Sequence, residues 1–445
     1  MPWVRSNLLC MALAIAAQAA TAQAQGDLLG VDDMAEAIVS MTSPVWTGPR
    51  TTAPDRVSRP PASLAIRSPY ALLTVHAGPG VSDRTLRRAL QALEHARARL
   101  DALGWPSPIP DGDLGGGPEL DLYLSAALPA AAYSDGLVPW SYLDRASTFA
   151  VVSPALPAAM IDACVTSAYA EAMLMSAEPA EARSWRRATA AWLTWELTGY
   201  AGCNDAVLGQ QAEPHRSWIA GAADGGSGGM IWLAYLSERH DAHSRRFIRD
   251  VWALASQRTW EGTGLRAEPD LWSAIDAAVS RSGDRLLDNV EELAVLRWFV
   301  GRGEPPHPLV ASLDADAKVP VTRRMTRLPS RVTAAHPLQP FGSAYATMNA
   351  AAWNDSTRLH CWLRGEYGVR WSLVAVQLDG HGNETRRIAA PHTTTTPNSY
   401  LPIELDERTQ QLLLVVTNLS NDVPDADEAD VHERAFELIV DRATN

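Results

Sequence analysis

Lysine is almost absent from this chain. Lys318 is the sole lysine, and arginine supplies the remainder of the 38 basic residues, against 51 acidic residues and a formal net charge of −13. Binding to nucleic acid or to an anionic membrane needs clustered basic charge, so the net negative charge argues against both classes of partner. We attribute the shortage of lysine to genomic bias rather than to function.

Long apolar runs are missing as well. The most apolar stretch near the start, "LLCMALAIAA", follows Arg5 and precedes a small-residue cleavage pattern at Ala22 and Ala24. It is shorter than the run of about 20 residues that crosses a bilayer, and it has the layout of a secretory signal peptide spanning 1–24. Cys10 lies inside this run without the small residues of a lipoprotein cleavage site. We therefore expect an exported, soluble protein, periplasmic or extracellular, with no membrane span.

Cysteine is scarce, with four residues in 445, and one of these, Cys10, is removed with the signal peptide. The remaining three are an odd number, so at least one thiol stays unpaired. Cys164 opens the first helix of a predicted hairpin and Cys203 follows the second, so antiparallel packing brings them together. Export permits disulfides, and we predict a Cys164–Cys203 bond and a buried thiol at Cys361. The alternative is three buried free thiols.

Length and composition predict two folded domains. A chain of 445 residues is too long for one typical core, and its 47% apolar and 20% charged residues describe a globular protein. After the signal peptide we expect an arm or linker over 25–64, which is rich in proline, arginine and threonine. Extended chain wrapped on the domain surface is the alternative for this segment. A first domain over 65–302, a linker over 303–322 and a second domain over 323–445 follow.

A few strands followed by many helices predict an α+β fold. "SPYALLTVHAG", "GPELDLYLS" and "STFAVVSPAL" are typical of strands, and between the first two a helix begins after Ser82 or Asp83 and ends at Gly104. Helical periodicity continues as far as "LLDNVEELAVLRWFVG" and then stops. Five short β-type runs, from "RLHCWLRG" to "AFELIVDR", predict an antiparallel β-sandwich as the second domain.

Residues 161–199 read as two amphipathic helices joined by a turn near Glu178. The first helix contains "VTSAYAEA" and the second contains "RATAAW". With the surrounding order of strands and helices, from Ser68 to Arg442, this pattern resembles a group of secreted bacterial metallopeptidases of the zincin type. In that family the first helix reads V-x-H-E-x-x-H-A, and the second, E-x-x-A-x-W, supplies the third metal ligand. The resemblance implies a zincin-like, mostly helical first domain with a small sheet.

Every catalytic position of that family is substituted in this chain. Ser167 stands at the first histidine, Ala168 at the general base, Glu171 at the second histidine and Arg187 at the third ligand. Serine is a poor zinc ligand beside imidazole, alanine has no proton to exchange, and the permanent charge of arginine repels a divalent cation. We therefore expect no catalytic residue, no metal and no cofactor at these positions, and an enzyme is disfavoured.

Two of the substitutions have opposite charges. We hypothesise that an ion pair between Glu171 and Arg187 replaces the metal ion as the link between the two helices. The alternative is that both charges are solvated and unrelated. The cleft beside Ser167, Glu171 and Arg187 is the predicted ligand groove, where an arginine suits the carboxylate of a peptide C-terminus or an acidic side chain.

Other chemistry-bearing residues are less convincing. His240 and His243 are spaced i, i+3. This spacing is compatible with a pair of metal ligands or with the solvated end of a helix, and we favour the helix end. Asp111 and Asp113 are compatible with a calcium loop or with a glycine-rich turn, and we favour the turn. The run "DVPDADEADVHE" offers the same choice between calcium and a solvated acidic loop. No G-x-S-x-G nucleophile elbow is present, and His76 has no ligand-like neighbour in the sequence.

Three functions remain open from the sequence. The leading hypothesis is an exported pseudopeptidase, a catalytically silent zincin scaffold that binds a peptide or protein or has a structural role. The second is an active secreted metallohydrolase whose ligands lie elsewhere in the chain. The third is an adhesive or structural envelope protein that acts through its β-sandwich. Ligand identity and oligomeric state are not predicted.

Overall fold

The first described elements of the chain build a mixed five-stranded sheet. The computed structural model describes residues 57–137, 145–203, 206–218, 227–256, 269–333, 336–353, 357–391, 398–420 and 432–443. The predicted signal peptide and residues 25–56 lie outside them. The strand order is β1-β2-β3-β5-β4, with β2, β3 and β5 parallel and the edge strands β1 and β4 antiparallel to their neighbours. The bounds are β1 Leu64–Arg67, β2 Leu73–Ala77, β3 Leu120–Leu124, β4 Ala131–Leu137 and β5 Ala146–Val152.

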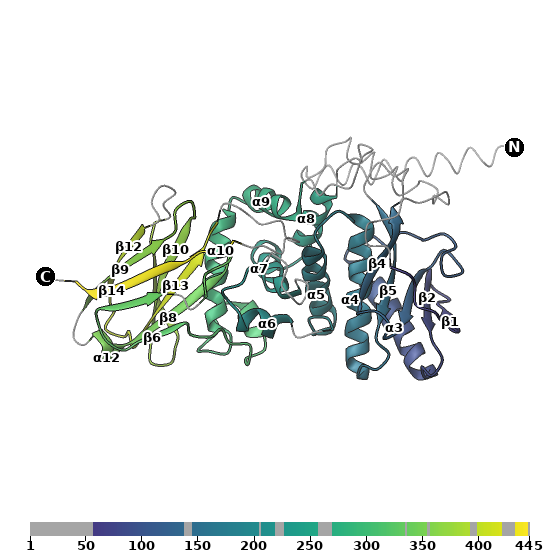
Figure 1. Cartoon of the computed structure of the whole chain (residues 1–445), viewed down its shortest axis with the longest axis horizontal. Helices are drawn as coiled ribbons and strands as arrows, with labels where there is room; N and C mark the ends of the chain where they lie inside the picture. The colour runs from purple at the N-terminus through teal and green to yellow at the C-terminus, as the bar shows by residue number, and fades with distance from the viewer. Residues whose placement is uncertain are drawn as a thin grey trace. The chain divides into compact units, whose positions relative to one another are not determined.

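Two helices, α3 (Asp83–Ala102) and α4 (Ala158–Ala177), cover one face of this sheet (Figure 1). The Ser82 hydroxyl accepts a hydrogen bond from the Thr85 amide at 3.1 Å, so the predicted helix start is confirmed with Ser82 as the N-cap. The apolar stripe of α3 is buried at Leu86, Leu93 and Leu100, because these side chains recur every turn or two on one face. Strand β4 was not predicted, because "AAYSDGL" lacks a β-branched run.

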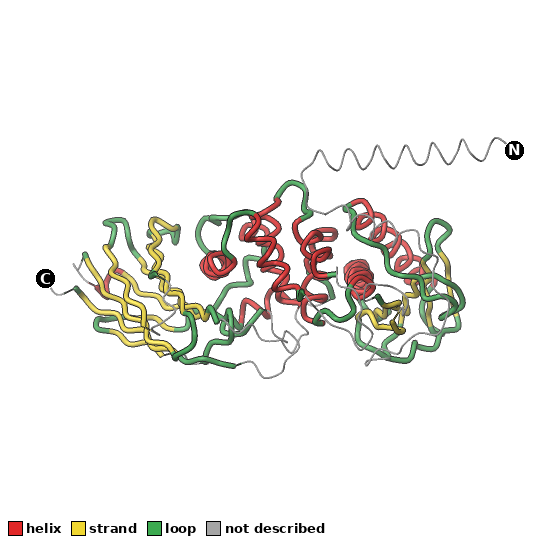
Figure 2. Tube along the Cα trace, turned by 90° about the horizontal axis from the view of Figure 1, so that it is seen from above, coloured by secondary structure: helices red, strands yellow, loops and turns green. Residues whose placement is uncertain are grey.

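A helical segment follows the sheet. The predicted helices are present, and α6 was not predicted. Figure 2 shows these helices between the two groups of strands. The bounds are α5 Arg183–Thr198, α6 Ala206–Ala212, η1 Ser227–Gly229, α7 Met230–Asp241, α8 Phe247–Ala255, α9 Leu271–Arg281, α10 Leu286–Leu296, η2 Arg297–Phe299 and α11 Pro308–Ser312.

The C-terminal strands form two further sheets. One has the order β11-β10-β13-β8-β6 and the other β12-β9-β14-β7; pairing is antiparallel except between β6 and β8. One hydrophobic cluster takes residues from both sheets, such as Leu363, Leu438, Leu373 and Leu414. The bounds are β6 Arg323–Met325, β7 Ser330–Thr333, β8 Ser343–Asn349, α12 Ala350–Trp353, β9 Arg358–Gly365, β10 Trp371–Leu378, β11 Glu384–Ala389, β12 Asn398–Glu404, β13 Gln411–Asn418 and β14 Phe436–Arg442.

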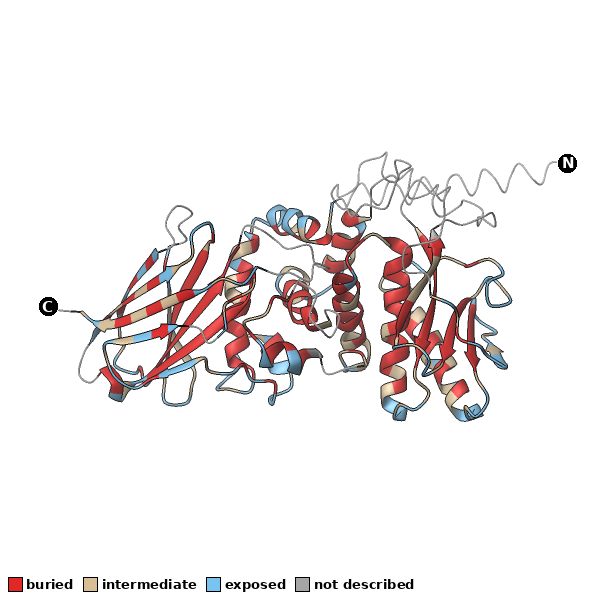
Figure 3. Ribbon diagram, viewed as in Figure 1, coloured by how far each residue is buried: buried red, intermediate tan, exposed pale blue. Residues whose placement is uncertain are grey.

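Strands β10 and β13 are buried on both faces, in contrast to the alternating burial of β9 and β12 (Figure 3). Their second face belongs to the same hydrophobic cluster as the helices, through Val374, Val376, Leu413 and Val415. This explains the unbroken apolar runs in their sequences, which are typical of strands covered on both sides. The described residues from 57 onward accordingly belong to one compact unit. Strands and helices that follow one another along the chain in separate blocks make the fold α+β.

Candidate functional site

Helix α4 lies at the centre of the candidate site. It packs against α3, β4 and β5 and also against α5, so it is buried on every face (Figure 1). The prediction of two amphipathic helices was therefore wrong for α4, because apolar neighbours on all sides require an apolar surface all round. The turn after α4 begins at Glu178, as predicted, and α5 ends at Gly199 with φ of 79°.

A disulfide joins the two ends of the hairpin. Cys164, in the second turn of α4, bonds to Cys203 in the loop after α5, with the two Cα atoms 4.7 Å apart. The predicted pairing is confirmed. Cys361 is a buried free thiol, also as predicted, and burial in an apolar environment raises its pKa. The disulfide ties the loop that follows α5 to the face of α4 that bears the candidate residues.

The structure brings Glu171 and Arg187 together across the hairpin. Arg187 Nε lies 3.6 Å from Glu171 Oε1, and the two side chains are 19% and 6% exposed. The separation is that of an ion pair rather than of a direct hydrogen bond, which is shorter. Because the pair is largely buried, the two opposite charges compensate each other where water is scarce.

Glu171 also contacts the edge of the first sheet. Its Oε2 accepts a hydrogen bond from the backbone N–H of Ala132 in β4, at 3.2 Å. An edge strand presents unpaired backbone N–H groups on its outer side, and the carboxylate of Glu171 satisfies one of them. Glu171 therefore bridges three elements: α4, α5 and β4. The sequence did not reveal this contact because β4 was not predicted.

Ser167 lies one helical turn before Glu171, on the same face of α4. It is half-buried, and it faces Gly202 in the loop held by the disulfide. A Cβ atom on Gly202 would lie 3.3 Å from Ser167 Oγ, and the φ of this glycine is +88°, which side chains rarely adopt. The close approach of this loop leaves the serine hydroxyl facing backbone rather than an open cavity. Ala168 is 3% exposed and belongs to the hydrophobic core.

Tyr133 lies in the same electrostatic surroundings as the ion pair. Burial raises the pKa of this tyrosine; Glu171 raises it further, while the charges of Arg183 and Arg187 lower it. Its hydroxyl donates a hydrogen bond to the Pro129 carbonyl at 2.8 Å. The phenol is therefore held by the loop that leads into β4 and remains protonated at neutral pH.

The four positions do not form a metal centre with the residues present. Across the described ranges no group of three or more His, Cys, Asp or Glu side chains is placed to hold a metal ion. At this site a guanidinium lies where a third ligand stands in the resembling family, and a cation repels a cation. The arrangement can hold two helices and an edge strand together, and it can present a positive charge to an anion.

A second polar cluster lies on the sheet face opposite α3 and α4, and the sequence did not predict it. Arg59, which precedes β1, donates to Asp135 through Nε at 2.9 Å and through Nη2 at 2.5 Å. It also donates to Asp121 and Asp111. The carboxylates are nearly inaccessible, with side chains 1–6% exposed. Three buried carboxylates therefore share one guanidinium, and burial raises the pKa of Asp111 to about 7.

His76 completes this cluster through a contact that its neighbours in the sequence do not indicate. Its Nε2 lies 2.7 Å from Asp121 Oδ1, and its ring stacks on Tyr123 at 4.7 Å. The Arg59 guanidinium lies 5.1 Å from the centre of the Phe149 ring. The one sequence signal for this cluster was the acidic Asp121 inside the apolar strand "LDLYL".

The remaining candidates are also accounted for. Asp111 is buried against the guanidinium whereas Asp113 is exposed, so the two aspartates do not share a calcium site. His240 contacts Asn289 at 3.2 Å, and its other ring nitrogen contacts a serine hydroxyl at 3.1 Å. His243 is exposed. The pair of histidines therefore does not converge on one point. Of the acidic run 422–433, residues 422–431 lie outside the described residues.

Helix α4 is the one described helix long and apolar enough to cross a membrane by length and composition. Within its most apolar window, 72% of the residues are buried inside the protein. A core helix covered by a sheet and by other helices passes such a test for that reason alone.

Comparison with known proteins yields weak similarities. No family model matches this chain, and no curated protein matches it. Solved structures with some similarity to this chain include a mitogen from Yersinia pseudotuberculosis. Its sequence identity is 13% and its TM-score is 0.19, and the match covers 26% of this chain and 90% of that chain. A copper-binding surface protein of Methylomicrobium album BG8 has 8% identity and a TM-score of 0.19, covering 28% and 98% of the two chains. The tailspike protein 4 of bacteriophage CBA120 has 12% identity and a TM-score of 0.18; 26% of this chain and 17% of that one are covered. Such scores support no argument about function.

Proposed function

We propose that this chain is an exported pseudopeptidase: a zincin-type scaffold over 65–302, joined to a β-sandwich over 323–445, that binds a peptide or protein and does not hydrolyse it. The observation that supports this proposal most is the Glu171–Arg187 ion pair between α4 and α5. A pair of opposite charges does there what a metal ion with three ligands does in the resembling family, which is to link two helices. It does so without an activated water.

The side chains at the four positions support a silent site. Hydrolysis of a peptide needs a polarised water and a group that takes its proton. Ala168 offers no such group, and Ser167 faces the loop at Gly202. Glu171 already accepts the Ala132 N–H and compensates the charge of Arg187. Each side chain is thus engaged in structure.

Arg187 is the group that a ligand would meet. Its side chain is 19% exposed, and its distance to the Glu171 carboxylate exceeds that of a direct hydrogen bond. A guanidinium binds a carboxylate with bidentate geometry, so a partly exposed Arg187 suits a carboxylate ligand. The ligand that fits is a peptide C-terminus or an acidic side chain. The Cys164–Cys203 disulfide is compatible with an oxidising compartment outside the cytoplasm.

The test is to restore the metal ligands and to ask whether the scaffold accepts them. In a Ser167→His, Glu171→His, Arg187→Glu variant, two imidazoles at i, i+4 and one carboxylate face each other across the hairpin. We expect about one zinc ion per chain in this variant by elemental analysis and none in the wild type. Neither protein should hydrolyse unstructured peptides, because position 168 lacks a base.

Two outcomes would contradict the proposal. Stoichiometric zinc in the wild type, with peptide cleavage that a chelator abolishes, would favour the second hypothesis, a metallohydrolase with ligands elsewhere. A restored variant that folds with the wild-type circular dichroism but takes up no zinc would show that the hairpin is not a zincin scaffold. The third hypothesis is adhesion through the β-sandwich. It requires that a peptide or surface bound by the wild type is bound equally well by Arg187→Met, because Arg187 lies outside the C-terminal strands.

A further inference from the structure

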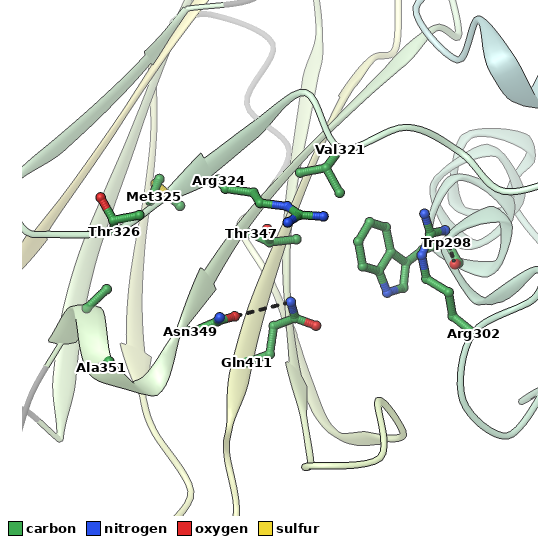
Figure 4. A pocket seen from close by; sticks show the side chains of 11 residues that line it. Trp298, Arg302, Val321, Arg324, Met325, Thr326, Thr347, Asn349, Ala351 and Gln411 are labelled. Carbon is green, nitrogen blue, oxygen red and sulfur yellow. Dashed lines mark hydrogen bonds between the residues drawn. The ribbon is translucent and has the colours of Figure 1, made fainter.

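A cavity of about 450 Å³ lies between the short helix η2 and the C-terminal strands β6, β8 and β13, remote in sequence from the hairpin (Figure 4). It is independent of the proposed pseudopeptidase site. Its volume falls in the range of small-molecule sites, which is about 300–1,000 Å³. The side chains that matter for its chemistry are Trp298, Arg302, Arg324, Thr347, Asn349 and Gln411.

Strand register explains why polar groups gather on the cavity floor. Arg324 lies opposite Thr347 in the pairing of β6 with β8, and Gln411 lies opposite Asn349 in the pairing of β13 with β8. Directly opposite residues, and residues two apart on one strand, project from the same face of a sheet. Tyr345, two residues before Thr347, donates its hydroxyl to a carbonyl of α10 at 2.7 Å. The cavity floor is therefore the helix-facing side of the sheet, just beyond the part that α10 covers.

The wall of the cavity is an arginine stacked on a tryptophan. The Arg302 guanidinium carbon lies 4.1 Å from the centre of the Trp298 ring. Its Nη1 donates to the Trp298 carbonyl at 2.9 Å, and its Nη2 donates to the Val319 carbonyl at 2.6 Å. These contacts fix the position of the guanidinium, but both acceptors are neutral. Burial lowers the pKa of Arg302, as expected for a cation that is partly desolvated without a counter-charge.

Arg324 adds a second positive charge. Its side chain is exposed and extends toward Trp298 and Arg302 (Figure 4). Neither arginine pairs with a carboxylate in the described part of the chain, and the described lining contains no acidic residue. In a protein with a formal net charge of −13, this cavity is a local exception of positive charge. Such a site raises the local concentration of anions.

The rest of the lining suits hydroxyl groups. The Asn349 side-chain oxygen accepts a hydrogen bond from the Gln411 amide at 3.4 Å, which orients both amides along the floor. The amide hydrogens of Asn349, the second amide hydrogen and the carbonyl of Gln411, and the hydroxyl of Thr347 supply donors and acceptors beside the two arginines. Side-chain amides and a hydroxyl therefore lie beside two guanidinium groups. A ligand with several hydroxyl groups and one anionic group matches this lining.

We propose that this cavity binds a small hydroxylated anion of the size of one acidic sugar residue, with its carboxylate or phosphate between Arg324 and Arg302 and its hydroxyl groups against Asn349 and Gln411. The shared chemistry is a sugar ring bearing one negative charge. A uronic acid and a sugar phosphate are the two sources of such a group, and the experiment separates them.

The experiment is isothermal titration of the full chain with three probes: glucuronic acid, glucose 1-phosphate and glucose. It is done in about 0.05 M salt, where screening is weak. We expect at least one of the two anions to bind with one site per chain, and glucose to bind at least tenfold more weakly. Binding should weaken in about 0.5 M salt, because the charge is solvent-accessible.

Matched variants assign the site. Arg324→Gln should weaken binding of the anion about tenfold or more, since a charged donor is lost. Arg323→Gln is the control: it removes the neighbouring exposed arginine of the same strand, which projects from the opposite face, and it should leave binding unchanged. Asn349→Asp retains both arginines but adds a negative charge to the floor, and should weaken binding by a similar factor.

The proposal is overturned by any of four results. Neither anion binds the wild type; glucose binds as tightly as the anions; or Arg324→Gln, folded as judged by an unchanged melting temperature, binds as the wild type does. Equal losses in Arg324→Gln and Arg323→Gln would point to a diffuse charge effect rather than to this cavity, and would overturn it as well.

Discussion

The ion pair between α4 and α5 makes an asymmetric prediction for two single substitutions. Arg187→Met removes the cation and leaves the Glu171 carboxylate, 6% exposed, in the core of the molecule. Glu171→Gln removes the anion and leaves Arg187, 19% exposed, at its border. The two variants delete the same interaction, but the charge that remains without its partner lies in different surroundings in each variant.

The expected magnitudes differ for that reason. Removal of one partner from a buried pair costs about 3–5 kcal/mol, and the partial exposure of the guanidinium reduces this to about 3 kcal/mol for Arg187→Met. The glutamine in Glu171→Gln still accepts the Ala132 N–H, and the arginine can turn toward solvent. We expect about 1 kcal/mol for this variant, the size of one modest hydrogen-bond effect.

The double variant tests the coupling. With both charges gone, no buried charge is left without a partner, so Glu171→Gln with Arg187→Met should be more stable than Arg187→Met alone. The coupling free energy should be about 1–2 kcal/mol. The assay is urea unfolding at pH 7, followed by far-ultraviolet circular dichroism for the wild type, both single variants and the double variant.

Equal effects of the two single variants would refute this reasoning, as would additive effects in the double variant. Either result would mean that the two charges are solvated independently in solution. The hairpin would then be held by its apolar contacts and its disulfide, and the pair would not act as the link between the helices.

Three further predictions concern stability. Burial raises the pKa of the Asp111 carboxyl from 3.8 to about 7, so the wild type loses stability as pH rises between those two values. The free energy of unfolding of Asp111→Asn, measured with urea, should therefore rise by about 2 kcal/mol relative to that of the wild type between pH 5 and pH 8. A constant difference across that pH range would contradict it. Replacement of Cys164 and Cys203 by serine should cost about 4 kcal/mol, given a sequence separation of 39 residues, and an unchanged midpoint of denaturation would argue against it. Residues 320–445 expressed alone should aggregate or bind an apolar dye, because Val374 and Leu413 would lose their helical cover; a soluble, dye-negative fragment would be inconsistent with this.

Much of the fold follows from local patterns in the sequence. The helix over Asp83–Ala102 was predicted with its start at Ser82 or Asp83, because a capping residue followed by a regular leucine stripe specifies the start and the buried face. The Cys164–Cys203 pairing was predicted because a helical hairpin brings its two ends together whatever its surroundings are. Strands such as Trp371–Leu378 were found from continuous apolar runs.

What escaped the sequence depends on contacts between distant segments. Strand β4 has a weak strand pattern and forms by pairing with β5, so the contact between Ala132 and Glu171 was invisible. The Arg59 cluster joins an arginine to carboxylates 52–76 positions away, and no local rule pairs them. The cavity beside Trp298 forms where α10 ends, so that the strands beyond it are left uncovered. The register of β6 and β8 places polar side chains on that uncovered face.

The sequence by itself therefore determined the class of the fold, the order of strands and helices along the chain and the pairing of Cys164 with Cys203, because each is set by composition or by neighbours along the chain. The tertiary structure decided which charges meet, which faces are covered twice and where a cavity remains. These features depend on the packing of segments that are far apart in the chain. Electrostatic interactions and burial depend on distances of a few ångströms, which the separation along the sequence does not set.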